Sequence, residues 1–228
     1  MRVIQQRTCR YDFWGVPSWI FSSSLVGRLL SLEPSAAVIK KIPFQAKTVS
    51  RNSRLLPDGG RIVSENQGLV ARDMFGRLRR EETYWTPFST NPTTTVFISD
   101  PVSGFCYRLD TRYCIAFKFI PFSSNNAYLP LEKPPAITSA INLGTCNIHG
   151  LSSEGKRAVA VFHGSGKSAT LRASIEKWYS LQLATVVVFK RDDPLTGTTV
   201  LELGEVSETE PESSLFEVPR AYRRVDEQ

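Results

Sequence analysis

The chain has 228 residues, of which 41% are apolar and 22% are charged, and a formal net charge of +6. These values are ordinary for a soluble globular protein with a buried core, and four cysteines are too few for a disulfide-rich scaffold. The first 80 residues hold 14 Lys/Arg against 5 Asp/Glu; without a zinc-ligand spacing or a helix-turn-helix pattern, this favours a solvated basic face, and no nucleic-acid partner is predicted.

The N-terminal segment, residues 1–43, has the residue order of a signal peptide but a poor apolar region. Three arginines precede the apolar stretch 13–27, and small residues at 34–37 offer a cleavage site. Trp14, Pro17 and a serine run interrupt this stretch, which is also too broken for a transmembrane helix. We therefore predict a degenerate signal peptide or a short amphipathic helix. The predicted location is periplasmic or secreted, with a cytoplasmic location and the cleavage itself left open.

From residue 44 onward, short runs of alternating apolar residues are separated by turn residues, which is typical of consecutive antiparallel strands. We predict one antiparallel β domain over residues 44–222, followed by a tail, 223–228. Its strands are expected at residues 46–55, 61–72, 77–85, 94–99, 105–110, 114–122, 145–149, 156–163, 169–179, 185–192 and 198–207.

Three connecting segments have readable patterns. The proline-rich stretch 123–140 has little periodicity and predicts a long loop. Residues 100–104 and 193–197 share the pattern Asp-Pro-x-x-Gly, which predicts a type I turn closed by a left-handed glycine, with the acids forming the turn. Near the C-terminus, residues 210–219 predict one short helical turn that places Leu215 and Phe216 against the core.

The stretch 161–170, VFHGSGKSAT, resembles the end of a nucleotide-binding P-loop. A complete P-loop needs a first glycine at the position that Val161 occupies, and a helix must follow it. The residues from Ala169 onward alternate with period two, like a strand. We therefore interpret Gly164-Ser-Gly-Lys167 as the tip of a hairpin and predict no nucleotide site.

No other pattern indicates catalysis. His149 and His163, even with Cys146, lack the spacing of a metal site, and adjacent acids such as Glu81-Glu82 point to opposite faces of a strand. Cys106 and Cys114 flank a predicted hairpin and are interpreted as free thiols, with a disulfide as the alternative in an oxidising compartment. The sequence predicts no enzyme, no metal and no cofactor, and leaves the oligomeric state unknown.

Several segments together resemble a family of uncharacterised bacterial exported proteins and, more distantly, the LolA-like superfamily of periplasmic lipoprotein carriers and sensors. The motifs that carry the distant resemblance are an early Gly-x-Arg hairpin, a Tyr-x-x-Asp strand, a Trp…Asp-Pro-x-x-Gly segment and a closing Ser-Leu-Phe-x-x-Pro. They correspond to residues 76–79, 107–110, 178–201 and 214–219. The expected N-terminal helix and lid segment are not matched by residues 13–32 and 123–140.

This resemblance implies a strongly curved antiparallel half-barrel whose concave face is apolar and holds acyl chains. The function expected from it is a non-enzymatic extracytoplasmic binding module for a lipid or a lipoprotein. The alternative is a structural or protein-interaction domain of the cell envelope, with an envelope protein as partner and no small ligand. The residues expected to line the concave face, or to form a closed core instead, are Tyr84, Phe105, Tyr107, Leu109, Ile115, Phe117, Phe119, Ile175 and Leu201.

Overall fold

The computed structural model of the chain describes residues 38–56, 58–84, 91–119, 137–163, 170–194 and 197–226. The predictions for residues 1–37 and for the Gly164-Ser-Gly-Lys167 tip lie outside these residues. So does most of the predicted loop 123–140. Within the described residues, no helix is long and apolar enough to cross a membrane.

The described chain is almost entirely β-strand, with one short 3-10 helix, η1, near its end. The elements are β1 (Phe44–Leu55), β2 (Arg61–Arg72), β3 (Leu78–Tyr84), β4 (Thr93–Asp100), β5 (Phe105–Asp110), β6 (Ile115–Phe119), β7 (Ile137–Ile148), β8 (Leu151–His163), β9 (Thr170–Ser180), β10 (Thr185–Asp193), β11 (Gly197–Ser207), η1 (Ser213–Phe216) and β12 (Arg223–Asp226).

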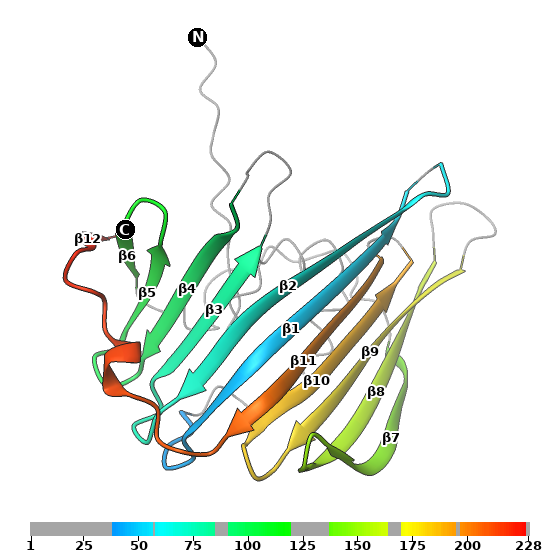
Figure 1. Ribbon diagram of the computed structural model, residues 1–228. Helices are drawn as coiled ribbons and strands as arrows, with labels where there is room; N and C mark the ends of the chain where they lie inside the picture. Colours follow the sequence, from blue (N-terminus) through cyan, green and yellow to red (C-terminus); the bar gives the residue numbers. More distant parts are fainter. Residues whose placement is uncertain are drawn as a thin grey trace.

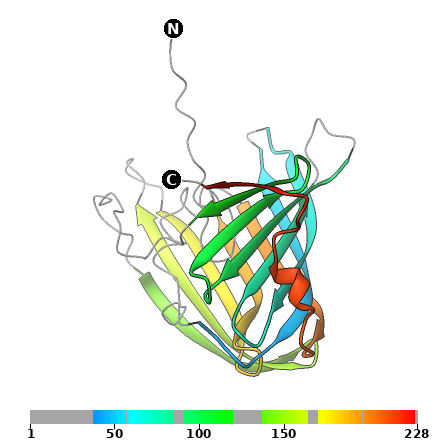
Figure 2. The same ribbon diagram turned by 90° about the vertical axis from the view of Figure 1, so that its left-hand side faces the viewer.

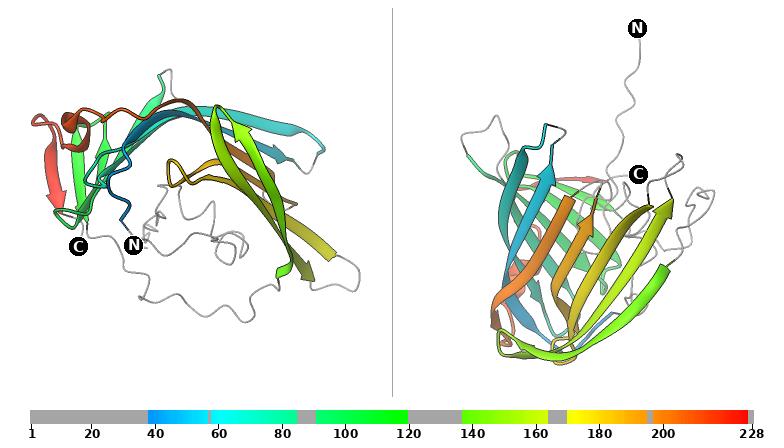
Figure 3. Two further views of the ribbon diagram at one scale, coloured as in Figure 1. Left: turned by 90° about the horizontal axis from the view of Figure 1, so that it is seen from below. Right: turned by 90° about the vertical axis from the view of Figure 1, so that its right-hand side faces the viewer.

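All described strands belong to one sheet, in the order β12-β6-β5-β4-β3-β2-β1-β11-β10-β9-β8-β7. Each strand pairs antiparallel with its neighbours except β12, which runs parallel to β6. The sheet bends into a deep arch, and its edges β12 and β7 do not meet (Figures 1 and 3). The predicted fold class, a strongly curved antiparallel half-barrel, is therefore confirmed.

The register divides the side chains between the two faces of the arch. Paired residues in neighbouring strands share a face, so the pairs Phe44–Arg72, Arg72–Leu78 and Leu78–Ser99 place these residues on one face. The C-terminal segment with η1 crosses the outside of β3–β5 (Figure 2), where Val218 packs with Val96 and other buried residues of the opposite set. The face of Phe44 is therefore the concave one.

This C-terminal segment, residues 208–222, covers part of the convex face, and we call it the strap. Val218 and Tyr222 of the strap pack on a cluster made of Val96, Ile98, Leu109 and Ala116. Phe216 is buried, as expected from the sequence, and the guanidinium of Arg77 lies 5.1 Å from its ring centre. Leu215 is half-buried, and its carbonyl oxygen accepts a hydrogen bond from Arg79 at 2.7 Å.

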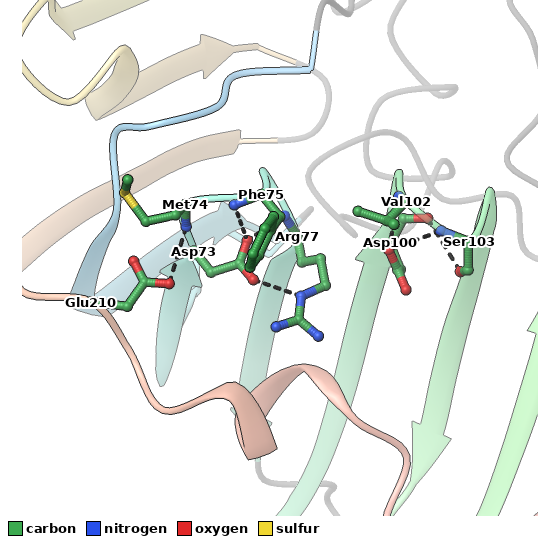
Figure 4. Close-up of polar contacts among 8 residues, drawn as sticks. All are labelled: Asp73, Met74, Phe75, Arg77, Asp100, Val102, Ser103 and Glu210. Atoms are coloured by element: carbon green, nitrogen blue, oxygen red, sulfur yellow. Dashed lines mark hydrogen bonds and ion pairs between the residues drawn. The ribbon is translucent and has the colours of Figure 1, made fainter.

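The turn between β2 and β3 is built on a buried acid, Asp73 (Figure 4). Its carboxylate accepts the main-chain N–H groups of Phe75 and Arg77 at 3.0 and 2.8 Å, and it pairs with Arg77 Nε at 2.6 Å. Gly76 closes the turn with φ of 83°, and a Cβ there would lie 2.8 Å from the carbonyl oxygen of Ile39. The Gly-x-Arg motif thus serves the fold.

The first Asp-Pro-x-x-Gly turn, residues 100–104, forms as the sequence predicts, while residues 195 and 196 of the second lie outside the described residues. The carboxylate of Asp100 accepts the N–H groups of Val102 and Ser103 at 2.8 and 3.1 Å, and Gly104 has φ of 77° (Figure 4). Gly197 has φ of 93°. Asp100 is therefore a turn-forming residue.

Most strand boundaries agree with the prediction to within a few residues, and three strands differ from it by more. Strand β7 begins at Ile137, inside the stretch expected to be a loop, and β8 begins at Leu151 instead of 156. Strand β12 lies in the predicted tail. These added segments lack a strong alternation of apolar and polar residues, so the sequence pattern did not predict them. Pairing with a neighbouring strand stabilises them instead.

Candidate functional site

The concave face of β3–β6 is the candidate site. Across it runs a row of paired residues in which apolar and cationic side chains alternate: Val70, Arg80, Phe97, Arg108 and Phe117. The rows on either side contain Leu78, Ser99, Cys106 and Phe119, and Glu82, Thr95, Asp110 and Ile115. This face is therefore mixed, with aromatic rings beside charged groups.

Four apolar side chains on the convex side of the same strands are buried more deeply than the apolar side chains of this face, while Phe105 and Tyr107 on the convex side are half-buried. Val96, Ile98, Leu109 and Ala116 on the convex side are fully buried under the strap. Those on the concave side are only half-buried, and within the described residues none of them belongs to a buried cluster. They are Tyr84, Phe97, Ile115, Phe117 and Phe119.

The structure separates the residues that the sequence predicted to line the concave face. Six lie on it by register: Tyr84, Ile115, Phe117, Phe119, Ile175 and Leu201. The other three, Phe105, Tyr107 and Leu109, lie on the convex face, because β5 pairs with β6 so that Leu109 faces Ala116 and not Phe117. Placing all three on the concave face was wrong. Leu109 and Ile175 are fully buried core residues.

Arg80 is the most constrained polar side chain of the site. It is 6% exposed, and its Nη2 pairs with the carboxylate of Glu82, which lies two residues along β3 on the same face. Its Nη1 is buried and has no hydrogen-bond partner within the described part of the chain. An unsatisfied buried donor costs about 1–3 kcal/mol, so this orientation needs an explanation.

Two further polar groups lie on the same face, on β5. The guanidinium of Arg108 stacks 4.4 Å from the ring centre of Phe117, which holds its charge beside an aromatic face. The thiol of Cys106 lies 3.6 Å from Ser99 Oγ, and burial raises the pKa of this thiol. Cys106 is therefore a neutral group at pH 7 and adds little charge to the site.

The narrow end of the arch below the site is closed by a buried cluster. Phe44, Val70 and Leu203 from the concave face pack there with Leu183, from the turn between β9 and β10. Arg72 crosses to that turn and stacks 4.8 Å from the Phe44 ring centre. Burial lowers the pKa of Arg72 to about 10, which still leaves it charged at pH 7. This end of the concave face is thus filled by protein.

The far half of the concave face is more tightly packed. Ile175, Ala158 and Ala173 form a small buried cluster, against which Phe189 packs. Leu201 pairs with Phe189 and is half-buried. The half-buried apolar side chains of the concave face therefore lie mainly on β3–β6, with Phe189 on β10 and Leu201 on β11 in the other half.

The residues weighed for metal binding and disulfides are not brought together. Within the described ranges, no group of three His, Cys, Asp or Glu side chains could hold a metal ion. Cys106 is buried and Cys114 is exposed in the turn that follows β5, and both are free. Cys106 pairs across the hairpin with Phe119, which explains why it does not meet Cys114.

Comparison with known proteins gives distant structural likeness only. No family model matches the sequence, and no curated protein matches it. Among solved structures, MucB matches with 9% identity and a TM-score of 0.40, over 89% of this chain and 64% of its own. A DUF1329 family protein from Desulfovibrio piger matches with 12% identity and a TM-score of 0.36, over 79% and 91% of the two chains.

A putative outer membrane lipoprotein-sorting protein domain from Vibrio parahaemolyticus also matches, with 11% identity and a TM-score of 0.28, over 76% and 88% of the two chains. The resemblance to LolA-like proteins is thus found in the structure as well, and it is distant. Likeness at these values carries no conclusion about a ligand, so the function is argued from the concave face alone.

Arg80, Arg108 and Phe97 are site residues that the sequence analysis missed. The alternation within each strand was readable, but which strand faces pair across the sheet depends on register. Phe97 lies in a predicted strand whose neighbours Val96 and Ile98 are equally apolar, so its own alternation did not assign it a face.

Proposed function

We propose that this protein is a non-enzymatic binding module that holds acyl chains of a lipid or a lipoprotein on its concave face. The observation that carries the proposal is the group of half-buried aromatic residues on the concave face of β3–β6, which belong to none of the buried clusters of the described residues. Apolar side chains that the fold leaves partly open on the concave side of a curved sheet are available to an apolar ligand. Each buried CH₂ of such a ligand contributes about 0.8 kcal/mol.

Native mass spectrometry tests this proposal. The folded protein is incubated with phospholipid, transferred to the gas phase, and the mass of any retained molecule is identified after organic extraction. We expect a retained lipid that denaturation releases. A protein mass without any addition, both as purified and after incubation, would contradict the proposal.

Matched variants locate the ligand. Phe117→Ser removes an aromatic ring from the concave face, whereas Phe105→Ser removes one of similar exposure from the convex face. We expect lipid retention to fall with Phe117→Ser and to stay at the wild-type level with Phe105→Ser.

We also propose an extracytoplasmic location, which rests on the order of arginines and apolar residues in 1–27. Fusion of residues 1–43 to a phosphatase that is active only outside the cytoplasm tests it. Activity of the fusion in a bacterial host is expected, and an inactive, stable fusion would contradict the location.

A second candidate function is a protein-interaction domain of the cell envelope. Four large apolar side chains are exposed on the turns at the lower end of the sheet: Met74, Phe75, Val102 and Leu181. These turns join β2 to β3, β4 to β5 and β9 to β10 (Figure 1). Crosslinking through these positions, with lipid retention absent, would favour this candidate over the first.

A further inference from the structure

Arg80 poses a question that acyl-chain binding alone does not answer. An arginine that is 6% exposed and lies in a row with Val70, Phe97 and Phe117 is costly, because its donors lose water. A binding surface for purely apolar groups would be more stable with an apolar side chain at this position.

The charge of Arg80 is already balanced, and the unsatisfied property is a hydrogen-bond donor. Glu82 pairs with Nη2, so the guanidinium and the carboxylate form a neutral unit. The buried Nη1 has no acceptor within the described residues. The other charged groups on this face of β3–β6 are Arg108, stacked on Phe117, and Asp110, which accepts main-chain N–H groups of its own turn at 3.0 and 3.1 Å.

We propose that Nη1 of Arg80 donates a hydrogen bond to the carbonyl oxygen through which an acyl chain is attached to its head group. This inference rests on the proposed function and specifies its ligand class as acyl esters and amides. A neutral carbonyl oxygen fits a donor whose charge is already paired, and the aromatic rings of Phe97 and Phe117, in the same row, lie where the adjoining methylene groups pack.

The geometry also gives a role to Glu82, which lies on the same face in the row next to that of Arg80. By holding Nη2, it fixes the plane of the guanidinium and leaves Nη1 as the donor for the ligand. Arg80 is thus a binding residue and Glu82 a positioning residue.

Displacement of an apolar fluorescent dye, N-phenyl-1-naphthylamine, tests the inference with two competitors of similar length. Methyl laurate carries an ester carbonyl, and n-tetradecane carries no oxygen. Arg80→Lys keeps a cation that can pair with Glu82 but has no second nitrogen in the place of Nη1. We expect this variant to bind methyl laurate about ten-fold more weakly than the wild-type protein. Its affinity for n-tetradecane should stay unchanged.

Arg54→Lys is the matched control, since Arg54 lies on the same face of β1 but is exposed. It should leave both affinities unchanged, and thermal unfolding verifies that each variant is folded. A folded Arg80→Lys protein with the wild-type ratio of the two affinities would overturn the inference, while dye binding would still support an apolar ligand. Failure of the wild-type protein to bind the dye would instead contradict the proposed function.

Discussion

Arg72 shows how single side chains fix the shape of this arch. From β2 its guanidinium donates to the main-chain carbonyl oxygens of Ile42, at 2.9 Å, and of Leu183 and Ala184, in the turn between β9 and β10. It therefore joins β2 to a turn whose nearer strand, β10, lies three places away in the sheet. One charged residue thus supplies the hydrogen-bond donors for three main-chain carbonyl oxygens at this buried end of the arch.

Replacing Arg72 by Met should lower the free energy of unfolding by about 2 kcal/mol, because three carbonyl oxygens lose a donor and only part of that loss is offset by removing a buried charge. Urea unfolding measures the change. The exposed Arg54→Met variant should be within about 0.5 kcal/mol of wild type. Equal stability of the two variants would contradict this role of Arg72.

The thiols of Cys106 and Cys114 differ in their surroundings, and we expect this difference to appear in their rates of alkylation. Burial raises the pKa of Cys106, so less thiolate forms at a given pH, whereas Cys114 is exposed on a turn. At pH 8, iodoacetamide should modify Cys114 about ten-fold faster than Cys106, as measured by peptide mass spectrometry. In urea the two rates should converge. Equal rates in the folded protein would show that the concave face at Cys106 is open to solvent.

At the scale of the elements, close contact between β8 and β9 depends on the absence of a side chain. Gly155 pairs with Trp178, and a Cβ at this glycine would lie 2.6 Å from the indole ring. The indole N–H donates to Glu176 at 2.8 Å, which fixes the ring in place. By contrast, a Cβ added to Gly204 on β11 would have no other atom within 4 Å.

Gly155→Ala should therefore destabilise the protein by about 1–3 kcal/mol through overpacking against Trp178. Gly204→Ala should be neutral or slightly stabilising, since alanine restricts the unfolded chain. Thermal unfolding, followed by tryptophan fluorescence, compares the two. Equal melting temperatures of Gly155→Ala and Gly204→Ala would contradict this role of Gly155.

The strap is the element that separates the two faces. Phe216 of the strap is buried, with the guanidinium of Arg77 over its ring, so Phe216→Ala should cost about 3 kcal/mol of stability. Because the strap lies on the convex face, the folded variant should keep the dye affinity of the wild-type protein. Glu217→Ala, at an exposed neighbour, is the control for both measurements. Loss of dye affinity in the folded Phe216→Ala protein would contradict the placement of the binding site on the concave face.

At the scale of the whole molecule, alternation and turn residues were enough to predict the antiparallel sheet, because each strand is bounded by glycine, proline or aspartate turns such as 100–104. The concave lining was only partly predictable. Phe117 and Tyr107 have equally regular alternation, and the register that places them on opposite faces is set by pairing across strands. Strand β12 pairs with β6 at the edge of the sheet through main-chain hydrogen bonds, and no side-chain pattern in its sequence predicts this pairing.

The two faces of the arch have different roles in this account, the convex one for folding and the concave one for binding. Photocrosslinking with a methyl ester whose acyl chain carries a diazirine tests this division most directly, with the labelled residues found by mass spectrometry. We predict labels on Tyr84, Phe97 and Phe117. Labels on Phe105 and Tyr107 of the convex face, or no specific label at all, would contradict it.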